Sequence, residues 1–265
     1  MERIHRMKIK ICTFNIRCDT VKDGINSFAG RQDLIRREFP KYEADVIGFQ
    51  EVRPHVHEWL EKNLTDYTVV GTGRDTDLGG EDMAIAFRTD KFLLVSLDTF
   101  WLSDTPHIPG SRFGTDQSSC PRICTAVTLL TRQERKLLRV YNTHLDHVGA
   151  MAQAQGISLV LSRIARDDMR YPGVPVVLTG DLNVTPDSPV IRNITAFRGG
   201  VLRDITADVG NTFHAYHPER TDRCIKIDYI FTNASAGDSE SMCLTDTEDG
   251  VYLSDHYPVL GEIEI

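Results

Sequence analysis

Polar residues adjoin apolar, strand-like runs at six widely separated places in this chain, and each place supplies a carboxylate, an amide or an imidazole. Strands that end at one edge of a sheet bring such distant residues close together, so we expect these side chains to line one pocket. A mixture of acids, amides and imidazoles suits a divalent metal and a phosphate ester better than it suits a hydrophobic core. The six segments are Thr13–Asn15, Gln50–Glu51, Asn142–His144, Gly180–Asn183, Lys226–Tyr229 and Ser254–His256.

The apolar runs alternate with helical patterns, but not in a strict one-for-one order. The strongest helical pattern covers residues 149–169, where apolar side chains recur at intervals of three and four. Strands in pairs with helices between them favour two packed sheets flanked by helices over a single doubly wound sheet. Weaker helical patterns cover residues 31–42, 52–63 and 189–196. Strands are expected at residues 8–13, 45–50, 67–70, 83–87, 92–101, 124–130, 137–142, 175–179, 229–231 and 259–265.

No stretch of the chain is rich enough in Gly, Ser or Pro to act as a linker between two domains. Large two-sheet folds reach a length of 265 residues without dividing. We therefore predict a single domain over residues 1–265, with residues 1–7 as a flexible N-terminal extension.

The charge balance limits the partners of the protein. A formal net charge of −8 disfavours a broad grip on duplex DNA, which relies on clustered Lys and Arg. The charge still allows a nuclease whose bound metal supplies positive charge locally. No apolar stretch approaches the roughly 20 residues that span a bilayer, and the expected hairpin tip at residues 132–135 is too polar to insert. We predict a cytoplasmic protein without membrane insertion and without an obligate protein partner.

Asp181 and Asn183 follow the expected strand at 175–179, and both would point to one face if the strand continued. A carboxylate beside an amide can take a proton from a water molecule and hold that water in line with phosphorus. An Asx turn that closes the strand would account for either residue alone.

Glu51 ends a strand that is apolar throughout, and a carboxylate at such a rim needs a partner. A hard divalent cation is one candidate, and the dipole of the helix that follows is the alternative. Asn15 is either a neutral metal ligand or a cap of its loop. Near the end of the chain, His256 can stabilise charge on a phosphoryl group if a carboxylate holds its ring, and Asp228 is the candidate for that carboxylate.

Taken together in this order, the six segments resemble the motifs of the endonuclease/exonuclease/phosphatase superfamily. The resemblance spans residues 8–265 and implies an α/β fold, a four-layer α/β/β/α sandwich of two packed mixed sheets flanked by helices. It places the site at one end of the two sheets. Phe100–Ser103 and Asn142–His147 are most similar to a bacterial group related to the nocturnin-like deadenylases.

The resemblance also implies a role for each motif residue. Glu51 corresponds to the principal magnesium ligand, with Asn15 beside it and Asp255 as a further acid on the metal side. Asp181 corresponds to the residue that orients or deprotonates the attacking water, with Asn183 as its helper.

Two histidines are implied to contact the phosphate. His256 is paired with Asp228. His144 is paired with Glu81, which lies seven residues before Arg88, as in the deoxyribonuclease branch of the family. Further candidates for substrate binding are Asn15, Arg122 and Asn142, and no role is assigned to Asp146 or His147.

The activity implied is a Mg²⁺-dependent phosphoesterase, with Mn²⁺ as a substitute, in which an activated water attacks the phosphate ester in line. We expect a nuclease, acting as an exonuclease on single-stranded nucleic acid. Two alternatives stay open: a phosphatase or phosphodiesterase of a small phosphorylated metabolite or phospholipid head group, and an inactive binding module on the same fold. The intact set of acids, amides and imidazoles weighs against the inactive module.

Overall fold

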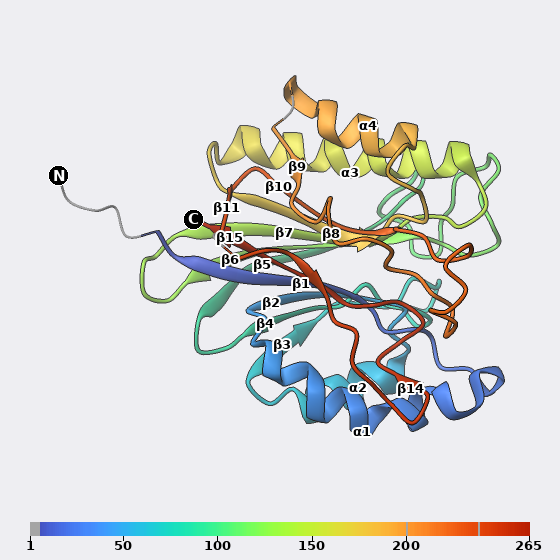
Figure 1. The fold of residues 1–265 in the computed structure, drawn as a ribbon. Helices are drawn as coiled ribbons and strands as arrows, with labels where there is room; N and C mark the ends of the chain where they lie inside the picture. The colour runs from blue at the N-terminus through green and yellow to red at the C-terminus, as the bar shows by residue number, and fades with distance from the viewer. Residues whose placement is uncertain (1–5, 200, 238) are drawn as a thin grey trace.

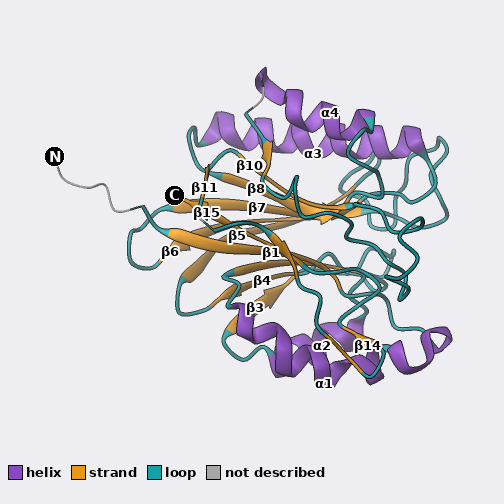
Figure 2. Ribbon diagram, in the orientation of Figure 1, coloured by secondary structure: helices purple, strands orange, loops and turns teal. Residues whose placement is uncertain are grey.

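The computed structural model describes residues 6–199, 201–237 and 239–265. Two mixed β-sheets pack face to face, and helices cover the outer face of each sheet (Figure 1). On one side lie α1 (Phe28–Glu38) and α2 (Pro54–Asn63), and on the other lie α3 (Ala150–Arg170) and α4 (Pro189–Ala196) (Figure 2). This arrangement confirms the predicted four-layer sandwich.

The first sheet has seven strands. Its neighbours run β11 (Ser235–Ala236), β15 (Val259–Glu264), β1 (Lys8–Asn15), β2 (Val46–Gln50), β4 (Ile85–Arg88) and β3 (Tyr67–Val70), with β12 (Met242–Cys243) also paired to β15. β1 is parallel to β2 and antiparallel to β15, so the first and the last strand of the fold lie side by side in this sheet.

The second sheet has six strands. They run in the order β5 (Phe92–Trp101), β6 (Ile123–Thr131), β7 (Leu137–His144), β8 (Val176–Asp181), β10 (Asp228–Thr232) and β9 (Arg203–Asp204). β7 and β8 are parallel, and the other pairs are antiparallel. A separate two-stranded ribbon consists of β13 (Thr247–Glu248) and β14 (Val251–Tyr252).

Among the described residues there are also three short 3₁₀ helices, at Val21–Asn26, Phe39–Tyr42 and Phe197–Gly199. The helix expected over 31–42 stops being α-helical at Glu38, since Pro40 lacks the N–H that the ladder needs. The helix expected from residue 52 begins at Pro54, because Val52 exchanges two backbone hydrogen bonds with Asp82 and is held extended. None of the helices that the structure describes is long and apolar enough to cross a membrane.

Part of the expected N-terminal extension is paired rather than flexible. Met7 and Ile265 exchange two backbone hydrogen bonds of 3.0 Å, which prolong the ladder between β1 and β15. Residues 1–5 of that extension lie outside the described residues.

The ends of the central strands set the position of the site. In the parallel pairs, Asn15 lies beside Gln50 at the end of β1 and β2, and His144 lies beside Asp181 at the end of β7 and β8. Parallel strands end at one edge of a sheet. Between the sheets the core is mostly aliphatic, and it includes Ile11, Val46, Val140, Val177 and Ile230. The polar segments therefore converge at the edge where this core ends.

Candidate active site

Asn15 lies at the centre of the converging residues and joins the two sheets. Its side-chain Nδ2 donates to Oε1 of Glu51 at 3.1 Å and to Oδ2 of Asp181 at 3.0 Å, and lies 3.4 Å from Nε2 of His256. Its Oδ1 accepts from the backbone N–H of Arg17 at 3.0 Å. The amide therefore holds two carboxylates from different sheets beside one histidine.

Glu51 leaves β2 in a left-handed conformation with φ of 63°, which turns its side chain from the strand into the cleft. The backbone N–H of Cys18 donates to its Oε2 at 2.7 Å. Burial alone would raise the pKa of Glu51, but the hydrogen bonds from Cys18 and Asn15 and the charge of His256 outweigh it and lower that pKa. Glu51 is thus held as a carboxylate.

One group of side chains could hold a cation. Ligand atoms of Glu51, Asp181 and His144 lie within 4.8 Å of one another. Carboxylate oxygens with one imidazole form a donor set that accepts a hard divalent ion. Asp181, Asp228 and His256 form a second group of this kind, but two of its members already pair with each other.

Asp255, the further acid expected on the metal side, belongs to neither group among the described residues. Its Oδ2 lies 3.5 Å from Nε of Arg17, and its Oδ1 accepts from Oγ of Ser254 at 3.2 Å. Burial raises the pKa of Asp255 although the charge of His256 opposes this change. In the structure, the charged neighbour of Asp255 is therefore the guanidinium of Arg17.

Asp181 divides its two oxygens between a turn and the cleft. Oδ1 accepts from the backbone N–H of Asn183 at 2.9 Å, which is the Asx turn considered as an alternative. Oδ2 faces the cleft, where it lies 3.5 Å from Nε2 of His144 and 3.8 Å from Nε2 of His256. Burial and the charge of Asp228 raise the pKa of Asp181 to about 7. The turn and a chemical role are therefore compatible.

His256 and Asp228 form the pair that we predicted. Nδ1 of His256 lies 2.9 Å from Oδ2 of Asp228, and both side chains are buried. Oγ1 of Thr212 donates to the same carboxylate oxygen at 2.6 Å. Burial alone would lower the pKa of His256, but the charges of Asp228 and Asp181 outweigh it and raise the pKa to about 10. This imidazole is therefore a cation at neutral pH, and its geometry confirms the predicted contact.

The predicted pair of His144 and Glu81 is wrong. Nδ1 of His144 has no hydrogen-bond partner among the described residues, and Nε2 lies 2.9 Å from Nδ2 of Asn183. Oε2 of Glu81 instead lies 2.8 Å from Nη1 of Arg74. Asp82 does not take the place of Glu81 as the partner of His144, because the carboxylate of Asp82 lies 2.9 Å from Nδ1 of His57. An arginine that the sequence spacing did not reveal neutralises Glu81.

Asn142 has a structural position rather than the predicted contact with substrate. Its Nδ2 donates to the backbone carbonyls of Phe49 at 2.7 Å and Ala84 at 3.0 Å. Its Oδ1 accepts from Nε2 of Gln50 at 2.7 Å and from Oγ1 of Thr179 at 3.1 Å. An amide has two donors and two lone pairs, so every group of Asn142 is used inside the protein.

Arg122 is buried, and Asp146 and His147 hold its guanidinium in place. Nη2 of Arg122 lies 2.9 Å from Nδ1 of His147, and its Nε lies 3.8 Å from Oδ2 of Asp146. Asp146 also accepts from the backbone N–H groups of Ser118, Val148 and Gly149. Asp146 and His147, to which the sequence assigned no role, therefore position this guanidinium.

Three residues that support the site could not be identified from the sequence. Thr212 holds Asp228, Arg17 joins Asp23 and Asp255, and Arg74 neutralises Glu81. All three come from outside the six segments or from loops without periodicity. Only a contact in space identifies them.

Most of the chain matches a known family of proteins. A model of the endonuclease/exonuclease/phosphatase family matches residues 12–256. Human 2′,5′-phosphodiesterase 12 is 30% identical in an alignment of 176 positions, which covers 60% of this chain and 28% of that protein. The chain thus spans less than a third of the length of this relative.

Two solved bacterial structures resemble the chain over nearly its whole length. An endonuclease/exonuclease/phosphatase from Bacteroides vulgatus is 31% identical with a TM-score of 0.89, covering 98% of this chain and 99% of its own. A mannosyl-6-phosphatase from Bacteroides thetaiotaomicron is 27% identical with a TM-score of 0.84, covering 97% of this chain and 99% of its own.

Proposed function

Because the chain belongs to the endonuclease/exonuclease/phosphatase family, whose members are phosphoesterase hydrolases, we propose that it hydrolyses a small phosphomonoester with Mg²⁺ as its metal. The observation that carries this proposal is the amide of Asn15, which holds Glu51 and Asp181 together beside His256. Such a cleft combines a cation site, a base and a fixed positive charge.

Glu51 would be the principal ligand of the metal, with the carboxylate of Asp181 beside it. The fit is supported by the carboxylate oxygens that face the cleft. It is also supported by the pKa of Asp181, which burial and the charge of Asp228 raise and which a nearby cation would lower. A bound Mg²⁺ would supply Lewis-acid polarisation of the phosphoryl group.

Asp181 would orient the attacking water and accept its proton. Oδ2 is the oxygen that faces the cleft, where it also accepts from Nδ2 of Asn15, whereas Oδ1 is turned away and accepts from the N–H of Asn183. A general base works best when its pKa lies near the operating pH, and burial brings Asp181 into that range. Asn183 holds the carboxylate on one side and the ring of His144 on the other.

The two histidines would act on the phosphoryl oxygens in different protonation states. His256 is held as a cation by Asp228 and would stabilise charge that develops on phosphate. Burial and the charges of Arg122 and Arg74 hold the pKa of His144 well below its usual value, so its ring is neutral. With Nε2 accepting from Asn183, its proton lies on Nδ1, which is left to donate to the substrate.

A small phosphomonoester is the substrate class that the comparisons and the charge favour. The match to the mannosyl-6-phosphatase covers nearly the whole of both chains. The net charge of −8 disfavours binding of a long polyanion such as a nucleic acid. The nuclease expected from the sequence stands as a second candidate. It is favoured by the 30% identity to human 2′,5′-phosphodiesterase 12 over part of the chain.

A substrate panel separates the two candidates. We would measure kcat/KM with Mg²⁺ for hexose 6-phosphates, nucleotides, a phospholipid head group and labelled single-stranded oligonucleotides with 3′,5′ or 2′,5′ linkages. The Asp181→Asn variant serves as the inactive control. We expect kcat/KM for a phosphomonoester to exceed that for the oligonucleotides by roughly 100-fold or more, because this ratio reports how differently the site binds the two transition states. Preference for an oligonucleotide would establish the second candidate, and no turnover of any phosphate ester would overturn both.

A further inference from the structure

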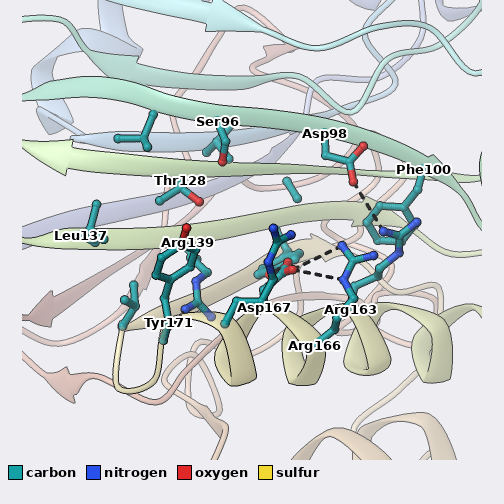
Figure 3. A pocket seen from close by; sticks show the side chains of 16 residues that line it. Ser96, Asp98, Phe100, Thr128, Leu137, Arg139, Arg163, Arg166, Asp167 and Tyr171 are labelled. Carbon is teal, nitrogen blue, oxygen red and sulfur yellow. Dashed lines mark hydrogen bonds and ion pairs between the residues drawn. The ribbon is translucent and has the colours of Figure 1, made fainter.

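A pocket of about 540 Å³ lies between the outer face of the second sheet and α3, away from the cleft (Figure 3). Its floor is formed by outward-facing residues of β5, β6 and β7, and its wall by the second half of α3. On β7 it begins at Leu137, at the opposite end of the strand from His144. The pocket is therefore separate from the site described above.

Small side chains on the floor account for the hollow. Ser96, Ala126 and Thr128 occupy neighbouring strands where larger residues would fill the space under the helix. The register of β5 also shifts between Leu94 and Ser96, which disturbs the pleat at the edge of the sheet. A space of this size falls within the range of about 300–1,000 Å³ that small-molecule sites occupy.

The lining of this pocket is basic in an acidic protein. Four arginines and two aspartates line it, which gives a formal charge of +2, whereas the whole chain carries −8. The guanidinium of Arg163 lies 4.8 Å from the ring centre of Phe100, and its Nη1 lies 3.7 Å from Asp98. Arg166 pairs with Asp167 at 3.3 Å, as the dashed lines in Figure 3 show. The two aspartates therefore leave Arg139 and Arg170 without a carboxylate from the lining.

Arg139 is the residue that points to a ligand. It is only 3% exposed, and its Nη2 donates to the backbone carbonyl of Tyr171. Its Nη1 has no hydrogen-bond partner among the described residues. A buried guanidinium that lacks an anion is costly, because its charge has lost water and gained no opposite charge. An anion in the pocket would complete its hydrogen bonds.

We propose that this pocket binds a small organic phosphate with an aromatic body, of the size of a nucleoside monophosphate. Nη1 of Arg139 can donate a charged hydrogen bond to a phosphate oxygen, and Arg170 adds a second positive charge to the lining. The exposed ring of Tyr171 beside the apolar side chain of Leu137 provides the surface for the aromatic body. The proposal does not depend on the activity assigned to the cleft.

The test is the binding of AMP by isothermal titration calorimetry in excess chelator, which prevents turnover. We expect one site, with adenosine and inorganic phosphate each binding roughly tenfold more weakly than AMP, because each lacks one half of the recognised chemistry. Arg139→Gln should weaken AMP binding by roughly tenfold or more, since it removes a charged hydrogen bond and keeps a polar group for Tyr171. Arg36→Gln, on an exposed arginine of α1, is the matched control and should change nothing.

A second variant guards against misfolding of Arg139→Gln. Thr128→Phe fills the floor of the pocket without changing its charge, and it should also abolish AMP binding. His256→Ala changes the cleft alone and should leave AMP binding intact. The proposal is overturned if AMP does not bind, if adenosine binds as tightly as AMP, if both pocket variants bind normally, or if His256→Ala removes the binding.

Discussion

Nδ2 of Asn15 donates a hydrogen bond of 3.0 Å to Oδ2 of Asp181, although the two residues are 166 positions apart in the sequence. Asn15 ends β1 of the first sheet and Asp181 ends β8 of the second, so this bond closes the cleft across the sandwich. The same nitrogen reaches Glu51, which comes from β2. An amide suits this position because it donates to both acids, whereas a third carboxylate would repel them.

Hydrolysis should depend on a divalent metal held by Glu51. We expect a chelator to abolish turnover of a phosphomonoester and Mg²⁺ or Mn²⁺ to restore it, because an oxygen-rich site prefers hard ions. Glu51→Gln should weaken Mn²⁺ binding, measured by calorimetry, while the circular dichroism spectrum and melting temperature stay close to those of the parent. Full activity in a chelator would remove the metal from the proposal.

Asp181→Asn should lower kcat by roughly 100-fold or more and leave KM nearly unchanged, because the carboxylate acts on the water rather than on the substrate. Steady-state kinetics on the preferred substrate measure both constants. Asp187→Asn, the same change on an exposed carboxylate of the following loop, is the control and should keep parental rates. If Asp181→Asn retains most of its kcat, another residue prepares the water.

Asp228→Asn should lower the pKa of His256 from about 10 toward its ordinary value of 6.5. The charged carboxylate favours the imidazolium, so the pair stabilises the fold fully below pH 6.5, and this contribution is lost as the pH rises through about 10. Heteronuclear NMR of the ring carbons follows the titration, with the exposed His55 as an internal reference. An unchanged pKa of His256 in the variant would show that other charges hold its proton.

The contact between His256 and Asp228 was predictable because each residue belongs to a short motif at a strand end. The buried position of Asn142, by contrast, could not be predicted. Asn142 and His144 lie on the same face of β7, but Asn142 sits about 6–7 Å deeper, two residues along the strand. The sequence does not show at which residue the strand leaves the core. It therefore could not show that His144 faces the cleft whereas Asn142 lies between the sheets.

The partner of Glu81 could not be predicted for a different reason. Its spacing to Arg88 matches a family pattern, but Arg88 pairs with Asp90 on the surface. Arg74 approaches Glu81 from a neighbouring loop, where the N–H of Arg74 also donates to the carbonyl of Glu81. Loop contacts of this kind have no periodicity in the sequence, whereas the strand and helix patterns placed nearly all of the central elements correctly.

Asn142→Leu should destabilise the fold without changing KM in the protein that remains folded. The change preserves side-chain volume but removes the buried hydrogen bonds that Asn142 donates to the carbonyls of Phe49 and Ala84 and accepts from Gln50. We expect the free energy of unfolding in urea to fall by about 2–4 kcal/mol, the order of several unmet buried hydrogen bonds. Asn193→Leu, at an exposed position of α4, should be nearly neutral. A rise in KM with unchanged stability would return Asn142 to the substrate site.

His214 should make the protein sensitive to mild acid. The ring is 3% exposed, neither of its nitrogens has a hydrogen-bond partner among the described residues, and it stacks on Tyr257 with 4.2 Å between ring centres. Burial, with a smaller contribution from the charge of His256, lowers its pKa from 6.5 to about 4. The neutral ring is therefore favoured in the folded state.

Above pH 6.5 the ring of His214 is neutral in both the folded and the unfolded chain, so its contribution to stability is fully present. As the pH falls from 6.5 to about 4, the unfolded chain takes up a proton that the folded protein refuses, and stability is lost. The loss should be on the order of 2–3 kcal/mol. His214→Phe keeps the stacked ring and removes the titration, so urea unfolding between pH 7 and 4 should show a correspondingly smaller decline. His55→Phe, on an exposed histidine, is the control. If His214→Phe and the parent lose stability equally over this range, other groups govern the acid sensitivity.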